Sequence, residues 1–538
     1  MNVSRVFLAT LLLGCLCSVR AQSHIANGTF EQIQGNGIPV NWNRAGEEDV
    51  GKIFPMQEDG ASYIRLQVEA PDQLVGIEQS VPIPSRVRGV EFHARFRNEN
   101  VKFGKSYIRD ARTRFQFHDA EGNPVGKNPG DMIFDSHARD WRDVSKKFLV
   151  PEGAVSLRVL VCLNRPVSGT LDVQEVRLVN MDEAEAREKA QIPLLAAQKK
   201  AADEAKIQQL LDLPPISRKL GVSGNTIIND RRETVLLQGV NVPSLEWSAK
   251  GENVLRSMKV ALVDWEANVV RLPVSSSLWF GRGRKEMESN DAEAYRAIVD
   301  DAIRIAAGQG AYLILDLHSY AAPRETAVEF WADAAARYAN HPAVMFDLYN
   351  EPHGISWELW QNGGEKTVKD KKTKKETVIQ VVGMQQLVNT VRAAGAKNLI
   401  FASGTSYALN LSGILEGHAL SDPGGYGIAY STHFYNWHKN WKKHFLQVAE
   451  KYPVLVGEFG ADVKKMSFIP AHQQENPHTF IPDALGMIQK HKLHWTAFSM
   501  HPKATPVLIQ NWNYDPTPFF GAYVMEALKG KIFEPGMR

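Results

Sequence analysis

The chain has 538 residues, of which 44% are hydrophobic and 23% charged, and its formal net charge at pH 7 is +2. This length exceeds what a single hydrophobic core usually serves, so at least two domains are expected. The nearly balanced charge argues against a nucleic-acid or anionic-membrane partner. We expect a monomeric protein with no obligatory protein partner.

The first 21 residues have the pattern of an export signal. Arg5 provides a positive charge, Val6 to Gly14 an apolar segment, and Val19-Arg-Ala21 a small-residue cleavage site. The apolar segment is too short to span a bilayer, so we expect a secreted or otherwise extracytoplasmic protein. One alternative stays open, because the segment ending in Cys15 resembles a lipoprotein box that would anchor the protein through this cysteine.

Residues 24–180 show the pattern of an all-β domain. Short runs with alternating apolar residues, such as Val90–Phe96 and Leu157–Cys162, are separated by turn-rich stretches. Their regular spacing predicts a sandwich of two sheets. The opening segments Asn27–Glu31 and Gly37–Trp42 resemble the start of jelly-roll carbohydrate-binding modules, which implies that this domain binds sugar.

Residues 181–215 change character and are rich in Ala, Glu, Lys and Gln, which are good helix formers. Pro193 is expected to interrupt the helix once. The segment is therefore predicted to be a semi-rigid helical linker between two domains.

Residues 216–538 form the second predicted domain. Eight apolar runs alternate with amphipathic helical stretches, which is the pattern of an α/β fold of the (β/α)8 TIM-barrel type. The predicted strands are Val235–Asn241, Asn268–Leu272, Tyr312–His318, Val344–Asn350, Asn398–Ser403, Gly427–His433, Pro453–Glu458 and Trp495–Ser499. A doubly wound sheet is not favoured, because no glycine-rich phosphate turn follows the first strand.

Two of these strands deliver a glutamate at their C-terminal ends, Glu351 after the fourth strand and Glu458 at the seventh. Active sites of such barrels lie at the C-terminal ends of the strands, so the two carboxylates are expected to share one site. Two carboxylates suffice to cleave a glycosidic bond, since one protonates the leaving oxygen while the other attacks or activates water. The pattern predicts a polysaccharide hydrolase.

From Gly239 to about Tyr523 the chain resembles the cellulase family, glycoside hydrolase family 5, whose catalytic glutamates follow strands four and seven. The matching segments occur in the order of the family: Val269-Val-Arg-Leu-Pro273, Leu315-Asp-Leu-His318, Leu348-Tyr-Asn-Glu-Pro352, Ser431-Thr-His-Phe-Tyr435, Val456-Gly-Glu-Phe-Gly460 and Trp495. The resemblance implies hydrolysis with retention of anomeric configuration.

The resemblance also implies the catalytic roles. Glu351 would be the acid/base and must be protonated when substrate arrives, whereas Glu458 would be the nucleophile and must stay ionised. Arg271 and Tyr435 would favour that ionised form.

The remaining implied contacts concern the sugar at the cleavage point. Asn350 would hold its 2-hydroxyl, His318 and His433 would line the same subsite, and Trp495 would form the platform beneath the ring.

Several alternatives remain for the substrate and class. The segment Phe346–Gly364 resembles endoglucanases, which favours an endo-β-1,4-glucanase (a cellulase) over a β-mannanase or another β-glucan or xyloglucan hydrolase. A lysine-rich insertion, Lys366–Lys375, is read as a solvated loop that lies on the catalytic side. A barrel that binds polysaccharide without cutting it is the alternative of a different class. A carbohydrate esterase is not favoured, because no Gly-x-Ser-x-Gly turn is present.

No metal and no cofactor is expected. The sequence has no His-Glu-x-x-His helix, and Cys162 is the one cysteine that follows the predicted signal.

Overall fold

The computed structural model describes residues 22–46, 51–102, 110–135, 138–283, 291–369 and 376–536. The predicted export signal and Cys15 lie outside these residues, so export stays a prediction. The chain divides into two compact units, Met1–Ala197 and Gln198–Arg538. Within the described ranges, no helix combines the length and apolar character needed to cross a membrane.

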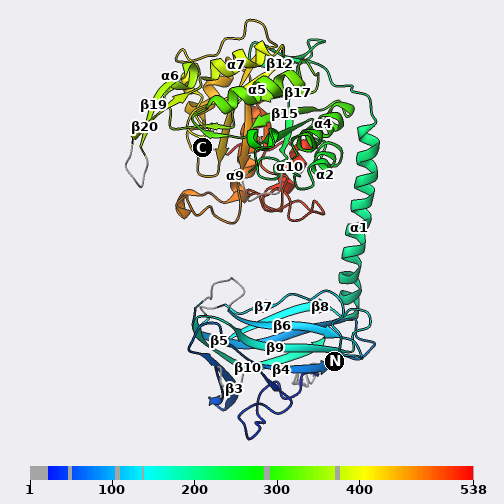
Figure 1. The fold of residues 1–538 in the computed structure, drawn as a ribbon. Coiled ribbons are helices and arrows are strands. Elements are labelled where there is room, and N and C mark those ends of the chain that lie inside the picture. Colours follow the sequence, from blue (N-terminus) through cyan, green and yellow to red (C-terminus); the bar gives the residue numbers. More distant parts are fainter. Residues whose placement is uncertain are drawn as a thin grey trace, which may run out of the picture. The chain divides into compact units, whose positions relative to one another are not determined.

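The described strands of the first unit form two five-stranded antiparallel sheets, which confirms the predicted sandwich (Figure 1). The sheets meet through their apolar faces, where Phe92 and Phe115 lie with ring centroids 4.9 Å apart. One sheet contains, in spatial order, β1 (Asn43–Ala45), β4 (Leu74–Pro82), β9 (Ser156–Asn164), β6 (Ala111–His118) and β7 (Met132–Ile133). The other contains β2 (Lys52–Glu58), β3 (Ala61–Val68), β10 (Ser168–Asn180), β5 (Gly89–Lys102) and β8 (Arg142–Leu149).

The sandwich is followed by the helix α1 (Glu183–Leu211), which continues through Pro193 instead of breaking there. Its first turn is attached to the first unit, because Lys147 Nζ of β8 lies 2.8 Å from Glu185 Oε2. The proline therefore removes one helical hydrogen bond without ending the helix.

The C-terminal end of α1 belongs to the second unit. Asp203 is buried and accepts hydrogen bonds from Arg256 Nε and Lys259 Nζ, both at 2.7 Å. Leu210 is fully buried in the apolar core of that unit. The segment is thus more than a linker, because its last turns complete the second core.

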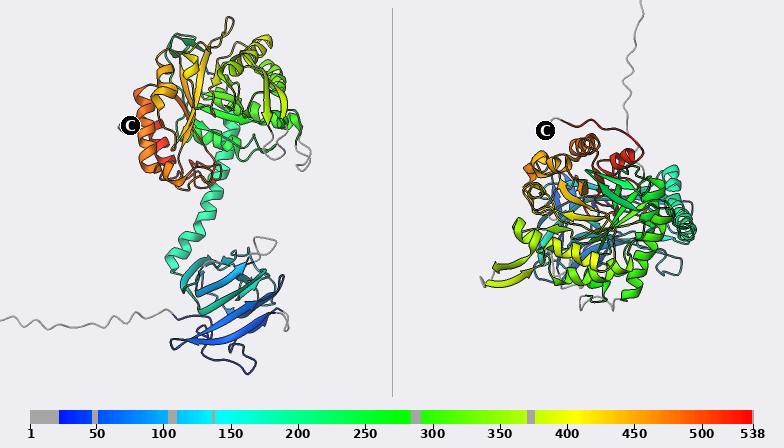
Figure 2. Two further views of the ribbon diagram at one scale, coloured as in Figure 1. Left: turned by 90° about the vertical axis from the view of Figure 1, so that its left-hand side faces the viewer. Right: turned by 90° about the horizontal axis from the view of Figure 1, so that it is seen from above.

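The second unit is built on a closed barrel of eight parallel strands, which confirms the predicted TIM barrel (Figures 1 and 2). The barrel closes where Gly239 of the first strand pairs with Thr496 of the last. In order around the barrel, the strands are β13 (Gln238–Asn241), β14 (Val269–Val274), β15 (Tyr312–Leu317), β17 (Val344–Asp347), β21 (Ile400–Ser403), β22 (Ile428–Tyr435), β23 (Val454–Gly460) and β24 (His494–Ala497).

Helices surround this barrel because each has one apolar face that is buried against the strands. In α4 the buried positions Tyr295, Val299, Ala302 and Ile303 recur at helical spacing, and Asp291 caps the first turn by accepting from the Glu293 amide at 2.9 Å. The helices are α2 (Val254–Lys259), α3 (Ser276–Trp279), α4 (Ala292–Gly308), α5 (Glu325–Arg337), α6 (Trp357–Asn362), α7 (Met384–Ala393), α8 (Gln447–Ala449), α9 (Pro477–Lys490) and α10 (Gly521–Leu528).

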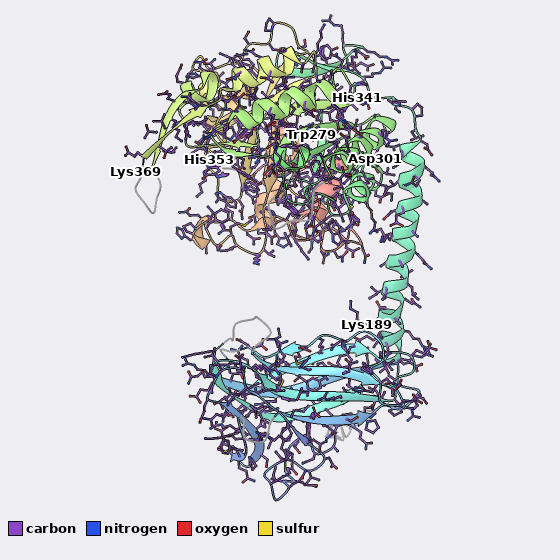
Figure 3. All side chains as sticks on the ribbon, in the orientation of Figure 1. Lys189, Trp279, Asp301, His341, His353 and Lys369 are labelled. Atoms are coloured by element: carbon purple, nitrogen blue, oxygen red, sulfur yellow. The ribbon has the colours of Figure 1, made fainter. Side chains whose placement is uncertain are left out.

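In the described part of the second unit, three two-stranded ribbons accompany the barrel: β11 (Leu220–Ser223) with β12 (Thr226–Asn229), β16 (Tyr320–Ala321) with β18 (Glu351–Pro352), and β19 (Gly364–Lys369) with β20 (Glu376–Val381). The last is the lysine-rich insertion, and Lys369 marks the end of its first strand (Figure 3). Residues 370–375 between its strands lie outside the described residues.

Candidate active site

A cavity of about 820 Å³ opens where the barrel strands end. Both predicted catalytic residues, Glu351 and Glu458, line this cavity together with His318 and Tyr435. These four side chains come from β15, β18, β22 and β23 or from the residues directly after them. Strand order therefore brings together residues that are more than one hundred positions apart in the chain.

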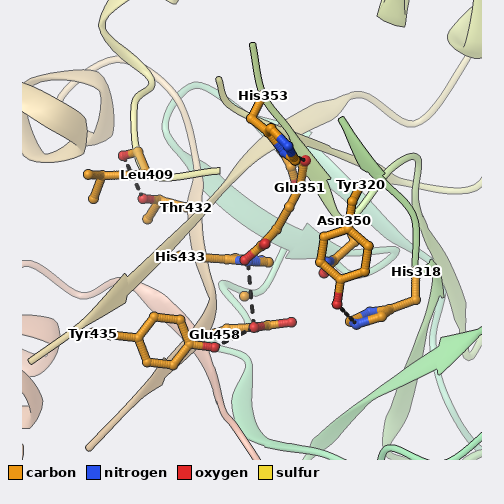
Figure 4. A network of polar contacts seen from close by, with 12 residues as sticks. His318, Tyr320, Asn350, Glu351, His353, Leu409, Thr432, His433, Tyr435 and Glu458 are labelled. Atoms are coloured by element: carbon orange, nitrogen blue, oxygen red, sulfur yellow. Dashed lines mark hydrogen bonds and ion pairs between the residues drawn. The ribbon is translucent and has the colours of Figure 1, made fainter. Parts of the chain in front are cut away.

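The two glutamates face each other beside His433 (Figure 4). His433 Nδ1 lies 3.1 Å from Glu351 Oε1 and 3.7 Å from Glu458 Oε2. One carboxylate oxygen of each glutamate lies within 4.8 Å of the other. The close packing requires Gly457 before the second glutamate, because a Cβ there would lie 2.5 Å from Ser431 Oγ and 2.9 Å from His433 Nε2.

Arg271 is fully buried beneath the cavity and holds three carboxylates. Its guanidinium nitrogens lie 2.9 Å from Glu458, 2.9 Å from Asp347 and 3.0 Å from Asp316. Removing one partner of a buried ion pair generally costs about 3–5 kcal/mol, because the remaining charge stays desolvated. Arg271 thus stabilises the barrel core and fixes the Glu458 carboxylate at the same time.

Asn350 is oriented by the same guanidinium. Arg271 Nη2 donates to Asn350 Oδ1 at 2.8 Å, which assigns the amide oxygen to the arginine. Among the described residues, Asn350 Nδ2 has no hydrogen-bond partner although it is buried. The amide therefore keeps donors for a ligand hydroxyl, as its expected contact with the sugar requires.

The surroundings of Glu458 favour its ionised form. Burial by itself raises the pKa of this carboxyl group, but electrostatic interactions with His433 and with the Arg271 guanidinium outweigh burial and hold the pKa well below its ordinary value. Tyr435 Oη adds a hydrogen bond of 2.5 Å to Glu458 Oε2. The carboxylate is thus ready to attack as an anion at neutral pH.

His318 is held from both sides. Its Nδ1 lies 2.7 Å from Asp316 Oδ2, and its Nε2 lies 2.9 Å from Tyr320 Oη (Figure 4). Burial lowers the pKa of His318, but the Asp316 carboxylate outweighs it and raises the pKa to about 9. The ring therefore carries a positive charge at neutral pH and adds to the electrostatic stabilisation of Glu458.

Trp495 does not lie where the resemblance implied. It is 1% exposed, belongs to the apolar core around the barrel and packs against Phe459 with ring centroids 5.9 Å apart. Phe498, directly after the end of β24, lines the cavity instead. Phe498 and not Trp495 is therefore the aromatic residue that this part of the chain presents to the cavity, because the tryptophan lies within the strand and not at its C-terminal end.

Sequence reasoning missed Asp316, Asp347 and Tyr320. The two aspartates pair directly across β15 and β17, and both lie within otherwise apolar strands. A carboxylate in a buried strand needs a cationic partner, and this signal was available in the sequence. Tyr320 had no comparable signal, because its contact with His318 depends on the short ribbon of β16 and β18.

None of the described residues of the insertion β19–β20 belongs to the cavity lining. Lys366 Nζ of β19 donates to the carbonyl oxygen of Gly354, three residues after Glu351, so the described base of the insertion lies beside the loop that carries this glutamate, as expected of an insertion on the catalytic side.

Glu351, His433 and Glu458 also form a set of oxygen and nitrogen donors within 4.8 Å of one another, which is a geometry that could hold a metal ion. Arg271 lies 2.9 Å from Glu458 and neutralises the same carboxylate. The permanent guanidinium charge opposes a cation at this position, so the arrangement suits proton transfer and nucleophilic attack.

Comparison with known proteins agrees with this geometry. Residues 228–504 match the model of the cellulase family, described as glycosyl hydrolase family 5. Endoglucanase A of Butyrivibrio fibrisolvens is 25% identical over 250 residues, which are 45% of this chain and 52% of that protein. Endoglucanase E-5 of Thermobifida fusca is 21% identical over 333 residues, which are 60% of this chain and 59% of that protein.

Two further comparisons show how much of each known protein the similarity covers. Endoglucanase MaCel5A of Microbulbifer sp. (strain ALW1) is 29% identical over 155 residues, so the matches span between 29% and 59% of these three relatives. The solved structure of the β-glucanase SdGluc5_26A from Saccharophagus degradans is 22% identical and has a TM-score of 0.47, covering 59% of this chain and 94% of that one.

Proposed function

Because the chain belongs to the cellulase family, glycosyl hydrolase family 5, we propose that it hydrolyses β-linked polysaccharide with retention of anomeric configuration. The observation that carries the proposal is the facing pair Glu351 and Glu458, whose nearest oxygens lie within 4.8 Å. Retaining glycosidases place their carboxyl groups about 5–5.5 Å apart, whereas inverting enzymes need about 6.5–9.5 Å to admit a water molecule.

The two glutamates take different roles because their surroundings differ. Glu458 contacts Arg271 and Tyr435, which favour the anion, so it attacks the anomeric carbon. Glu351 contacts His433 and is 13% exposed at its side chain, so it can reach the leaving oxygen and exchange its proton. A covalent glycosyl-enzyme forms first, and Glu351 then acts as a base to release it with water.

The first-formed product tests this mechanism. We expect the purified protein to hydrolyse a soluble β-1,4-glucan and to release the β-anomer initially, because two inversions at the same carbon give net retention. Proton NMR within the first minutes distinguishes the anomers before mutarotation mixes them. An initial α-anomer would contradict the nucleophilic role of Glu458.

We propose endo-β-1,4-glucanase activity as the more specific function. Support comes from the relatives, which are named endoglucanases, and from the open cavity, which continues beyond the two glutamates to Trp437 and Phe468. Product analysis on cellulose, mixed-linkage glucan, xyloglucan and mannan identifies the preferred polymer, and mixed oligosaccharides as early products distinguish internal from terminal cleavage.

We further propose that the sandwich binds polysaccharide and holds the barrel near insoluble substrate. Support comes from the outer face of the sheet that contains β5, which carries grooves of about 350 and 390 Å³. Arg97 on this face lies 4.5 Å above the ring of Trp141, which gives a polar and aromatic surface of the kind that sugars contact. A tethered module raises the local concentration of substrate without touching the scissile bond.

Deleting the sandwich tests this role, and the structure defines where to cut. We expect a variant that begins at Gln198 to keep activity on soluble oligosaccharides and to lose binding to insoluble polymer. A variant that begins at Pro214 lacks Asp203 and leaves Arg256 and Lys259 without this buried partner, so it should be less stable by about 3–5 kcal/mol. Pull-down on insoluble glucan and thermal unfolding measure both effects, and unchanged polymer binding of the Gln198 variant would contradict the proposal.

A further inference from the structure

The segment after β23 carries an unusually exposed aromatic residue to the rim of the active-site cavity. Phe468 is 74% exposed, yet it lines the same cavity as Glu351 and Glu458. Its neighbours Met466 and Ile469 line this cavity as well. Single exposed apolar side chains are common on protein surfaces, so the position of Phe468 matters only if the segment is held in place.

One buried glutamine holds the segment that carries Phe468 in place. Gln474 is 7% exposed, and its Nε2 donates to the carbonyl oxygens of Met466 and Ile469, both at 2.8 Å. Its Oε1 accepts from the Met466 amide at 2.7 Å. The amide of Ile469 closes the turn onto the Met466 carbonyl at 3.3 Å. Both residues that flank the turn are therefore fixed, and Phe468 is presented outward by a preorganised backbone.

Phe468 continues a row of aromatic rings that starts at the nucleophile. Tyr435 contacts Glu458 and stacks on Trp437 with centroids 5.1 Å apart and an interplanar angle of 13°. Trp437 in turn meets Phe468 edge to face, with centroids 6.2 Å apart. The row follows the cavity outward from the point of cleavage, along the residues after β22 and β23.

We propose that Phe468 and Trp437 form a distal sugar-binding subsite, which binds a pyranose ring of the polysaccharide away from the bond that is cleaved. The inference rests on the proposed function and adds the residues that give it a preference for long chains. A pyranose presents an apolar face of C–H groups, and an aromatic ring held at a fixed angle can pack against it without further loss of side-chain freedom.

The variant Phe468→Ala tests the subsite. We expect its KM for cellohexaose to rise about tenfold, which corresponds to the loss of one aromatic contact. Its kcat/KM for an aryl β-cellobioside, which has fewer sugar rings and on this proposal does not occupy the distal subsite, should stay within about twofold of the wild-type value. Phe468→Trp should restore the preference for the long substrate. Because Phe468 is exposed, none of these changes should lower Tm.

Val463→Ala is the matched control. Val463 lies in the same segment and is 57% exposed, but it does not line the cavity, so its replacement should leave both substrates unaffected. If Phe468→Ala changes both substrates equally or neither of them, while the wild-type protein hydrolyses cellohexaose, the subsite is wrong and the proposed function stands. If the wild-type protein hydrolyses no β-glycan, the proposed function itself fails. Calorimetric titration of Glu458→Ala with cellohexaose, with and without Phe468→Ala, then decides the subsite by binding alone.

Discussion

Replacing Glu458 by alanine is expected to lower the turnover of β-glucan by at least about 10⁴-fold, as removal of a covalent nucleophile does in other hydrolases. The carboxylate lies beside Tyr435 and Arg271, and Glu351 is the one other carboxylate among the described residues that line the cavity. The fold should persist, because Arg271 keeps its ion pairs with Asp316 and Asp347 at 3.0 and 2.9 Å. Initial rates and thermal unfolding measure the two effects separately.

A second variant and a reaction with azide make this test more specific. Glu458→Gln keeps the size of the side chain but has one acceptor oxygen where Glu458 accepts from Arg271 and Tyr435 with two, and it removes the nucleophile, so it should lose as much activity as Glu458→Ala. Azide can enter the space left by the alanine variant and attack an activated aryl glycoside directly, which gives an α-glycosyl azide by a single inversion. Either variant retaining a tenth of wild-type activity would refute the assignment of Glu458.

Replacing Glu351 by alanine is expected to lower turnover of unactivated β-glucan by about 10²–10⁴-fold, the usual contribution of a general acid. The loss should nearly vanish for the first step on dinitrophenyl glycosides, because such leaving groups depart without protonation. The contact with His433, at 3.1 Å, is also lost, so thermal unfolding should accompany the rate measurements. Comparable losses on activated and unactivated substrates would count against the acid/base role.

The second step of the reaction, hydrolysis of the glycosyl-enzyme, further distinguishes the roles of the two glutamates. Without Glu351, water lacks a base and the glycosyl-enzyme accumulates, which a burst of aryl alcohol reports. Azide needs no base, so it should release a β-glycosyl azide from this variant. The opposite anomers of the azide products from the Glu351 and Glu458 variants thus identify the two roles in a single pair of experiments.

Local patterns in the sequence determined the barrel and its two glutamates. A buried parallel strand is a short apolar run, and each of the eight predicted runs contains or overlaps a barrel strand. Glu351 and Glu458 could be placed because they follow the apolar runs directly, and strand ends of a barrel converge on one side. Arg271 and Tyr435 could be named by resemblance alone, and the structure places both in contact with Glu458.

Tertiary structure decided which side chains meet and which face they occupy. Asp316 and Asp347 contact Arg271 through the register of three neighbouring strands, and the sequence contains no measure of that register. Trp495 was named as the platform by resemblance, but side chains alternate between the two faces of a strand, and the structure buries Trp495 in the core while Phe498, three residues later, lines the cavity. The last turns of α1 likewise look like any solvated helix in the sequence, but Asp203 and Leu210 are buried in the barrel unit. Short-range patterns are set by the residues themselves, whereas contacts across the barrel exist only after the chain has closed on itself.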